Sequence, residues 1–482
     1  MKKLFTKINW KIFILVLIIV FNGPSIYFKI THPSFYLDPL SFSLPDNSSS
    51  TSPTGVCNIK DFGAIADSPE KAPANQQAIQ KAIDSCVDKQ HALFIPAGKW
   101  FSGGLYFHNN NSWVFLDKEA TLSFVYNPKL YLPLRPSRFE GYELINFSAP
   151  LYFDNLTNGG IIGGGKITLQ EPEKWHKWDK VEKPAKKLLF KYSKKNTPLK
   201  ERVFGKESDG LRPPFLQLYN SNNFVLSDII IDHSTMWTIH SLYSNNLLFQ
   251  DLTVLTNGPN TDGLVIDSST GVIIKDNIFS TGDDAIVLKS GSDHDGRRID
   301  KPTEKVSVRN ISVHDAHGAV VIGSEMSGGI SDVDIKNINI SKADIGLRIK
   351  TRPGRGGYVR NINLDGLKAE KLTDELIKIN NHYKEAIGKT NPSPELYPKI
   401  ENISLQNAET KSSNRAIFID GLKELPIKNL TLRNIKAGQE QRSKIVNVLN
   451  PRLENINIFF TEKSPFKNSS TVWTKSTTPL LN

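Results

Sequence analysis

The sequence predicts an all-β protein, a right-handed parallel β-helix with an N-terminal capping helix. A short apolar pattern rich in β-branched residues recurs after residue 220, and Asn, Asp and Gly separate its copies. From Val225 the copies follow at steps of about 23, 24, 34, 27 and 26 positions, a period typical of solenoids. One coil of this kind cannot bury its apolar face alone, so neighbouring coils must stack to form a continuous core.

The ends and interruptions of the repeat predict the rest of the architecture. An open solenoid end exposes unpaired strand edges, and residues 76–87 offer a helix to cover it, with Ile79, Ala82, Ile83 and Cys86 on one face. The polar stretch 291–304 accounts for the long step of about 34 positions in the repeat. Residues 165–212 break the repeat, and we expect a helical or looped excursion beside the cleft. The Asn residues at the turns predict side-chain ladders.

The N-terminus predicts export. Four lysines within the first eleven residues precede the apolar run 12–21, and Asn22, Gly23 and Pro24 end it. About ten apolar residues suit a secretory signal, whereas a membrane span needs roughly 20. No clear small-x-small cleavage site follows. We therefore expect a signal peptide or N-terminal membrane anchor over 1–27, and a secreted, periplasmic or membrane-anchored protein.

The remaining boundaries follow from composition. Residues 28–54 are rich in Pro and Ser and predict a linker. The parallel β-helix is expected over 55–462 and a C-terminal tail over 463–482. Export permits a disulfide between Cys57 and Cys86, but Cys86 also fits the buried face of the capping helix, so both interpretations stay open. We expect a monomer.

The net charge of the chain favours certain classes of binding partner but does not select one of them. The chain carries a formal net charge of +11 and has a pI near 9.2, which favours polyanionic partners such as nucleic acid, anionic membrane or acidic polysaccharide. The basic residues are not interleaved with aromatic residues on one element, which argues against nucleic acid. No Cys/His cluster has zinc spacing, and we expect neither a metal site nor a cofactor.

Candidate catalytic residues follow from the coil spacing. Residues one coil apart stack about 4.8 Å apart in a parallel solenoid. Asp262 and Asp283 are separated by about one coil. The spacings between the other candidate residues are also close to one coil, or to one coil plus the polar stretch. They predict that one face of the solenoid carries Trp237, Asp262, Asp283, Asp284, His317, Arg348 and Lys350.

Three neighbouring aspartates call for a chemical explanation. One Asp in a turn is usually a turn former, but the adjacent pair Asp283 and Asp284, with Asp262 one coil away, brings like charges together at an energetic cost. Such a cluster binds a cation or performs acid–base chemistry. Nearby cations favour a bound anion over a metal. Glycoside hydrolysis uses such carboxyls, about 6.5–9.5 Å apart when water attacks directly, a range that adjacent coils can span.

Four motifs, in chain order, resemble glycoside hydrolase family 28, the polygalacturonases. They are Asn260-Thr261-Asp262-Gly263, Gly282-Asp283-Asp284, His317-Gly318 and Arg348-Ile349-Lys350. Stretches at 138–141, 212–214, 296–304 and 321–329 are also similar, the last two to the bacterial exo-acting branch. One departure is Ala316, where the family usually has Gly, and a displaced His317 loop is a possible consequence.

The resemblance implies an inverting hydrolase that cuts α-1,4-galacturonosidic bonds in polygalacturonate or pectin. It implies that Asp283 is the general acid, that Asp262 and Asp284 hold and activate the water, and that His317 tunes the acid. The implied substrate-binding residues are Arg348, Lys350, Asn260, Lys289, Tyr383 and Trp237.

Several alternatives stay open. The same fold serves rhamnogalacturonan and xylogalacturonan hydrolases, and the sequence does not separate exo from endo action. A β-helix lyase would use Arg or Lys as base and usually calcium, but His317 and Arg-Ile-Lys favour hydrolysis. A non-catalytic polysaccharide-binding solenoid has no reason to keep three clustered carboxylates.

Overall fold

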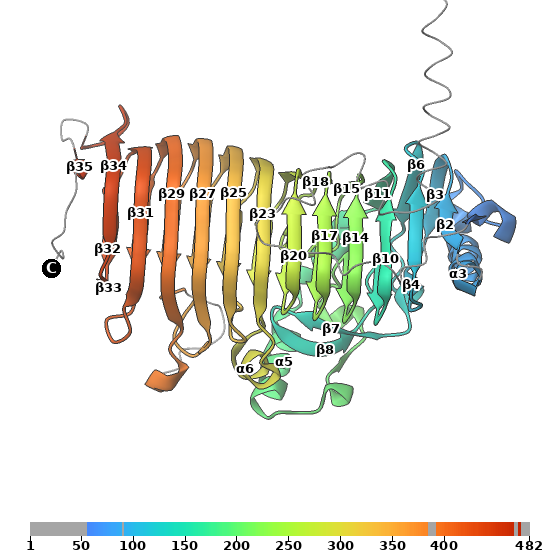
Figure 1. Ribbon diagram of the computed structural model, residues 1–482. Helices are drawn as coiled ribbons and strands as arrows, with labels where there is room; N and C mark the ends of the chain where they lie inside the picture. Colours follow the sequence, from blue (N-terminus) through green and yellow to red (C-terminus); the bar gives the residue numbers. More distant parts are fainter. Residues whose placement is uncertain (1–54, 89–90, 384–391, 467–470, 474–482) are drawn as a thin grey trace, which may run out of the picture.

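The computed structural model describes residues 55–88, 91–383, 392–466 and 471–473. Within these residues the chain forms a parallel β-helix, as predicted, with the N-terminal coils at one end and the C-terminal coils at the other (Figure 1). Two long sheets run the length of the stack, one of 21 strands (sheet A) and one of 11 strands (sheet B).

Sheet A contains β1 (Gly55–Asn58), β2 (His91–Ile95), β3 (Gly98–Ser102), β5 (Ser112–Leu116), β6 (Ala120–Phe124), β10 (Thr157–Ile162), β11 (Lys166–Leu169), β14 (Asn222–Ser227), β15 (Ile230–Asp232), β17 (Asn245–Gln250), β18 (Thr253–Leu255), β20 (Thr270–Lys275), β21 (Ile278–Ser280), β23 (Thr303–Asp315), β25 (Ile330–Ala343), β27 (Tyr358–Leu372), β29 (Lys399–Ser413), β31 (Ile427–Gln439), β33 (Val448–Leu449), β34 (Arg452–Phe460) and β35 (Thr471–Trp473). Sheet B contains β4 (Leu105–Phe107), β9 (Leu151–Asp154), β13 (Leu216–Tyr219), β16 (Ile239–Leu242), β19 (Leu264–Asp267), β22 (Ile286–Lys289), β24 (Gly318–Gly323), β26 (Ile345–Lys350), β28 (Glu375–Asn380), β30 (Arg415–Asp420) and β32 (Lys444–Val446).

A third, small sheet and the helices lie outside the stack. The small sheet contains β7 (Arg135–Phe139), β8 (Tyr142–Asn146) and β12 (Val203–Phe204). The α-helices are α3 (Ala72–Asp88), α4 (Pro172–His176), α5 (Lys183–Lys194) and α6 (Asp293–Ile299). The 3₁₀ turns are η2 (Ile59–Phe62), η3 (Pro69–Lys71), η4 (Pro128–Tyr131), η5 (Lys177–Lys180), η6 (Leu199–Glu201), η7 (Glu207–Asp209) and η8 (Pro394–Leu396).

Parallel pairing in register puts equivalent side chains of successive coils in rows. On β19, Leu264 and Ile266 point into the core, whereas Val265 points outward between them. Following the pairing of sheet B from strand to strand gives one outward row, which consists of His240, Val265, Val287, Val321, Arg348, Lys378, Phe418 and Lys444. After the three valines the row carries Arg348, Lys378, Phe418 and Lys444, so three of its last four side chains are cationic.

The predicted asparagine ladders are present at the turns. The Asn337 side-chain amide donates to Oδ1 of Asn310 (3.1 Å), and Asn310 donates in turn to Oδ1 of Asp276 (2.9 Å). Each of the three residues has a left-handed backbone, with φ between 54° and 58°. Asn and Asp tolerate this conformation better than other non-glycine residues, so they both bend the chain and link the coils.

The predicted capping helix is α3, which begins at Ala72, four residues before the predicted start. Ile79, Ala82 and Ile83 are buried against the first coil. Cys57 and Cys86 are joined as a disulfide, with their Cα atoms 5.8 Å apart. Cys86 is also buried on the helix, so both interpretations of this residue hold.

The excursion beside the cleft is also present, and a hairpin that the sequence analysis did not predict accompanies it. The hairpin β7–β8 and the helix α5 lie outside the stack of coils, below it in Figure 1. We call this the cover. Its apolar side chains, Leu144 and Leu189 among them, form one buried cluster with Val265, Val287 and Val321 of the outward row.

Part of the sequence analysis lies outside the described residues. These parts are the signal or anchor segment 1–27, the linker 28–54 and most of the tail 463–482, so export stays a prediction. Among the described residues, no helix combines the length and the apolar character needed to span a membrane.

The alternation along β21 gives a test of the stacked core. Phe279 is fully buried, whereas its neighbour Ile278 is 38% exposed on the other face of the strand. We expect Phe279→Ala to lower the free energy of unfolding by about 3–5 kcal/mol because it leaves a cavity. Ile278→Ala is the matched control, and its effect should stay within about 0.5 kcal/mol. Urea unfolding of both variants measures the difference, and equal losses would contradict the assigned facing of this strand.

Candidate active site

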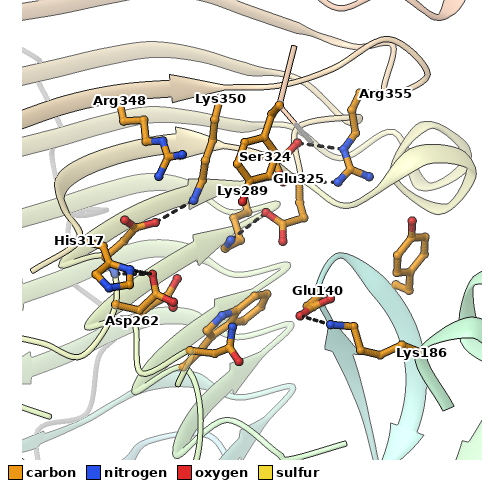
Figure 2. Close-up of a pocket in the computed structure, with 16 residues that line it drawn as sticks. Glu140, Lys186, Asp262, Lys289, His317, Ser324, Glu325, Arg348, Lys350 and Arg355 are labelled. Atoms are coloured by element: carbon orange, nitrogen blue, oxygen red, sulfur yellow. Dashed lines mark hydrogen bonds and ion pairs between the residues drawn. The ribbon is translucent and has the colours of Figure 1, made fainter. Parts of the chain in front are cut away.

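All ten residues singled out in the sequence line one cavity of about 320 Å³ on sheet B (Figure 2). They are Trp237, Asn260, Asp262, Asp283, Asp284, Lys289, His317, Arg348, Lys350 and Tyr383. Six further residues complete the lining: Glu140, Tyr142, Lys186, Ser324, Glu325 and Arg355.

The three aspartates lie in turns that lead into strands of sheet B. Asp262 precedes β19, and Asp283 and Asp284 precede β22. Inter-coil backbone bonds fix these turns, since Gly263 N–H donates to the Asp284 carbonyl (2.9 Å) and His317 N–H donates to the Asp283 carbonyl (3.1 Å). One carboxylate oxygen from each aspartate lies within 4.8 Å of the other two. These nearest oxygens are therefore closer together than the range expected from the sequence.

Two of the aspartates have cationic partners. The Lys350 ammonium donates to Oδ2 of Asp284 (2.9 Å), and Nδ1 of His317 lies 3.4 Å from Oδ1 of Asp283. Asp262 forms no ion pair with any residue that the structure describes. Like charges in one site are thus partly compensated, and Asp262 is the carboxyl left without a counter-ion.

These surroundings separate the pKa values of the aspartates. Burial, together with the neighbouring Asp283 charge, raises the pKa of Asp262 well above its ordinary value, although Lys289 opposes the shift. Burial also acts to raise the pKa of Asp283, but the His317 hydrogen bond and the Lys350 charge outweigh it and lower that pKa. The pKa values of Asp262 and Asp283 are thus shifted in opposite directions, so Asp262 is the more readily protonated of the two.

His317 titrates together with Asp283. Its hydrogen bond to Asp283 raises the pKa of His317 to about 9, against the opposing effect of burial. The imidazolium form, and with it the ion pair, is present at lower pH and is lost as the pH rises through about 9. His317 is therefore charged throughout the acidic and neutral range.

Three cations of the lining differ in their pairing. Lys289 is buried, donates to Oε2 of Glu325 (2.8 Å) and lies 4.7 Å from the centre of the Trp237 ring. Lys350 is held by Asp284. Arg348 forms no ion pair with any described residue, and its guanidinium lies 5.5 Å from the centre of the Tyr383 ring. Arg348 is therefore the lining cation with the most donor capacity for an incoming anion.

Hydrogen bonds from Arg212 hold Asn260 in position. The buried Arg212 guanidinium donates to Oδ1 of Asn260 (2.8 Å) and to the Pro259 carbonyl (2.8 Å). Asn260 itself has a left-handed backbone (φ 56°). Arg212 thus fixes the orientation of a predicted site residue without itself lining the cavity.

The departure at Ala316 leaves the His317 loop in place. Ala316 does not have positive φ, so its Cβ causes no backbone strain. Its side chain packs into the core at 4% exposure. His317 stays within reach of Asp283, contrary to the displacement considered from the sequence.

Comparison with known proteins agrees with this geometry. Residues 200–454 match the family model described as glycosyl hydrolases family 28. The chain belongs to this family. It is therefore a glycoside hydrolase of the polygalacturonase type, and the fold class predicted from the sequence is confirmed.

Relatives and solved structures cover most of the chain. An exo-poly-alpha-D-galacturonosidase of Dickeya chrysanthemi is 25% identical over 447 residues, which are 87% of this chain and 72% of the relative. A probable polygalacturonase of Vitis vinifera is 26% identical over 398 residues, 81% and 75% of the two chains. The crystal structure of a hyperthermoactive exopolygalacturonase from Thermotoga maritima has a TM-score of 0.76 and 30% identity, and covers 83% of this chain and 91% of its own.

The sequence analysis pointed to some of the six additional lining residues and not to others. Glu140, Ser324 and Glu325 lie in stretches that were noted only for their similarity to the family. Lys186, Tyr142 and Arg355 were not singled out in the sequence. The cover that carries Lys186 and Tyr142 docks through contacts distant in sequence, and Arg355 lies in the loop between β26 and β27. Glu140 forms the hairpin tip with φ 44°, an unusual backbone for a residue other than Asn or Gly, and the Lys186 ammonium donates to its carboxylate (2.8 Å).

We expect His317→Asn to raise the pKa of Asp283, because the variant removes the imidazolium that lowers it. The acidic limb of the pH profile of kcat/KM on polygalacturonate should move to higher pH by about one unit or more. His314→Asn, an exposed histidine of β23 outside the cavity, is the matched control and should leave the profile unchanged. A lower rate with an unshifted acidic limb would show that His317 does not control the charge of Asp283.

Proposed function

We propose that this hydrolase removes galacturonate units from the ends of polygalacturonate chains, with inversion at the anomeric carbon. The observation that supports exo action best is the change along the outward row of sheet B. Val265, Val287 and Val321 are completely buried beneath the cover. From Arg348 onward the row is partly exposed, and it ends at the exposed Lys444.

The cover blocks one direction along the cleft. The valines under the cover belong to β19, β22 and β24, the strands that directly follow the aspartates and His317, so on these coils the substrate has the cavity and no open groove. Glu140 and Lys186 of the cover line the cavity, and Figure 2 shows this ion pair across the cavity from Arg348 and Lys350. A chain end fits such a site better than a chain interior.

The charges support a substrate that carries carboxylates. The Arg348 guanidinium presents a planar fork of N–H donors that matches a carboxylate in two-point contact. We assign the galacturonate carboxylate first to Arg348 and then to Lys350, which already donates to Asp284. The relatives named exo-poly-alpha-D-galacturonosidase and exopolygalacturonase support the same substrate class.

The catalytic cycle we propose moves one proton between two aspartates. Because the pKa of Asp262 is raised and that of Asp283 is lowered, we assign the proton of the free enzyme to Asp262, and coupled carboxyls titrate as a pair. Transfer of this proton to Asp283 makes Asp283 the acid and leaves Asp262 as the base. Asp283 protonates the glycosidic oxygen as its bond to the anomeric carbon breaks. Water adds to that carbon and gives its proton to Asp262, which restores the starting state.

The water is held between Asp262 and Asp284. Their nearest oxygens lie within 4.8 Å, and two hydrogen bonds of about 2.7–2.8 Å each can bridge that gap. Carboxyl separations of about 5–5.5 Å are typical of retaining glycosidases, and those of inverting enzymes are about 6.5–9.5 Å. The stereochemistry of the first product is therefore a decisive measurement for this mechanism.

Product analysis tests the proposed function. We expect polygalacturonate to release monogalacturonate from the first minutes, while the viscosity of the solution falls slowly. Rhamnogalacturonan and xylogalacturonan are compared in parallel, and Asp283→Asn is the inactive control. Early release of mixed oligomers would contradict exo action. Faster cleavage of either alternative polymer would contradict the assigned substrate.

We expect Asp283→Asn to lower kcat by about 10²–10⁴-fold, since the amide cannot donate a proton as an acid does. A substrate with an activated leaving group needs little protonation, so it should partly rescue Asp283→Asn. The same substrate should not rescue Asp262→Asn or Asp284→Asn, which loosen the water. Asp84→Asn on the exposed face of α3 is the control and should retain full activity.

Two outcomes would contradict this assignment of roles. Rescue of Asp262→Asn in place of Asp283→Asn would make Asp262 the acid, as its raised pKa in the free enzyme permits. An α configuration of the first product by NMR would mean retention through a covalent intermediate, whereas the proposed direct attack by water yields the β configuration.

A further inference from the structure

Sheet B continues for three strands beyond Arg348, and its outward side chains change character there. In the outward row, Arg348 is followed by Lys378 of β28, Phe418 of β30 and Lys444 of β32. Each step is one coil, about 4.8 Å. Lys378 and Phe418 are partly exposed and Lys444 is exposed, whereas the valines earlier in the row are buried.

Phe418 is surrounded by cations. The Arg415 guanidinium carbon lies 5.1 Å from the centre of the Phe418 ring, the Lys444 ammonium 5.5 Å and the Lys378 ammonium 5.9 Å. We call Lys378, Arg415, Phe418 and Lys444 the outer strip. A partly exposed aromatic ring with cations beside it offers an apolar surface for the C–H face of a sugar and donors for its carboxylates.

Acidic neighbours hold the cations of the outer strip in place. Glu375 accepts from Lys378 (2.8 Å) and lies 3.6 Å from Arg415, and Asp420 accepts from Lys444 (3.0 Å). Asp374 lies 3.7 Å from Lys378. The strip is thus close to electrically neutral. A lysine ammonium has three N–H donors, so donors remain for a ligand, and binding depends on stacking and directed hydrogen bonds more than on net charge.

We infer that the outer strip binds the leaving-group side of an acidic pectic chain while its terminal sugar occupies the cavity. This inference rests on the proposed exo action. The cover packs over the outward side chains of β19, β22 and β24, whereas those of β28, β30 and β32 are partly or fully exposed, so the rest of the chain extends past Arg348 over these three strands. A sugar unit of an extended polymer is comparable in length with one coil, so successive units meet Lys378, Phe418 and Lys444 in turn.

The test compares short and long substrates. Digalacturonate cannot reach from the cavity to Phe418, whereas an octagalacturonate can. We expect Phe418→Ala and Lys378→Met each to lower kcat/KM for the octamer by about fivefold or more, because truncation of a central contact residue usually weakens binding to this extent. The value for digalacturonate should not change. The products should also stay the same, since the cavity is intact.

Matched controls come from sheet A. Phe459→Ala removes an exposed aromatic side chain from β34, and Lys436→Met removes an exposed cation from β31. Neither residue lies in the outward row, so neither variant should change the ratio of the octamer and dimer values. Phe418→Leu keeps the apolar volume without the aromatic ring, and it replaces Phe418→Ala if that variant unfolds at lower temperature.

The outcomes separate the inference from the proposed function. Equal losses on dimer and octamer, or no loss on either, would overturn the outer strip as a binding site. Wild-type enzyme that releases no galacturonate from either oligomer would overturn the proposed function itself. Titration calorimetry of Asp283→Asn with octagalacturonate, with and without Phe418→Ala, should show weaker binding in the double variant.

Discussion

Parallel pairing in register is the constraint on which the rest of this structure depends. Each coil hydrogen-bonds to the next along its whole length, and a shift of one residue would turn every core side chain outward. The apolar interior therefore fixes the register, and the register fixes the rows on the outer face. Leu264 and Ile266 inside the core thus determine where Val265 and the neighbouring Asp262 stand.

The same constraint brings like charges together at the active site, where they repel one another. Stacked turns bring Asp262, Asp283 and Asp284 together, and none can move without breaking inter-coil bonds such as that from Gly263 to Asp284. The repulsion is relieved by cations from later coils, Lys350 and His317, which arrive by the same register. Asp262 has no such partner, and burial raises its pKa well above the ordinary value. The cluster therefore contains one carboxyl whose pKa is raised, Asp262, and one whose pKa is lowered, Asp283.

Much of this arrangement could be predicted from the sequence, because a solenoid converts sequence spacing directly into distance. The period placed His317 beside Asp283, and Arg348 and Lys350 on the following coil, with no knowledge of long-range contacts. The cover could not be predicted in this way. Its hairpin docks through pairs such as Arg138 with Asp267, 129 positions apart, and no local pattern specifies that contact. Which aspartate has the raised pKa was also beyond prediction, since this depends on burial and on the balance of several charges.

The cover shows how a repetitive fold acquires a directional site. An uncovered solenoid presents a groove that is similar in both directions along its axis. Here apolar packing buries the outward valines, and the ion pairs Arg138–Asp267 and Arg202–Asp295, both fully buried, fix the hairpin and the adjoining loop over them. Breaking a buried pair by removing one partner typically costs about 3–5 kcal/mol, so these contacts strongly disfavour lifting of the cover. Direction along the cleft therefore comes from a non-repeating element, while the chemistry comes from the repeat.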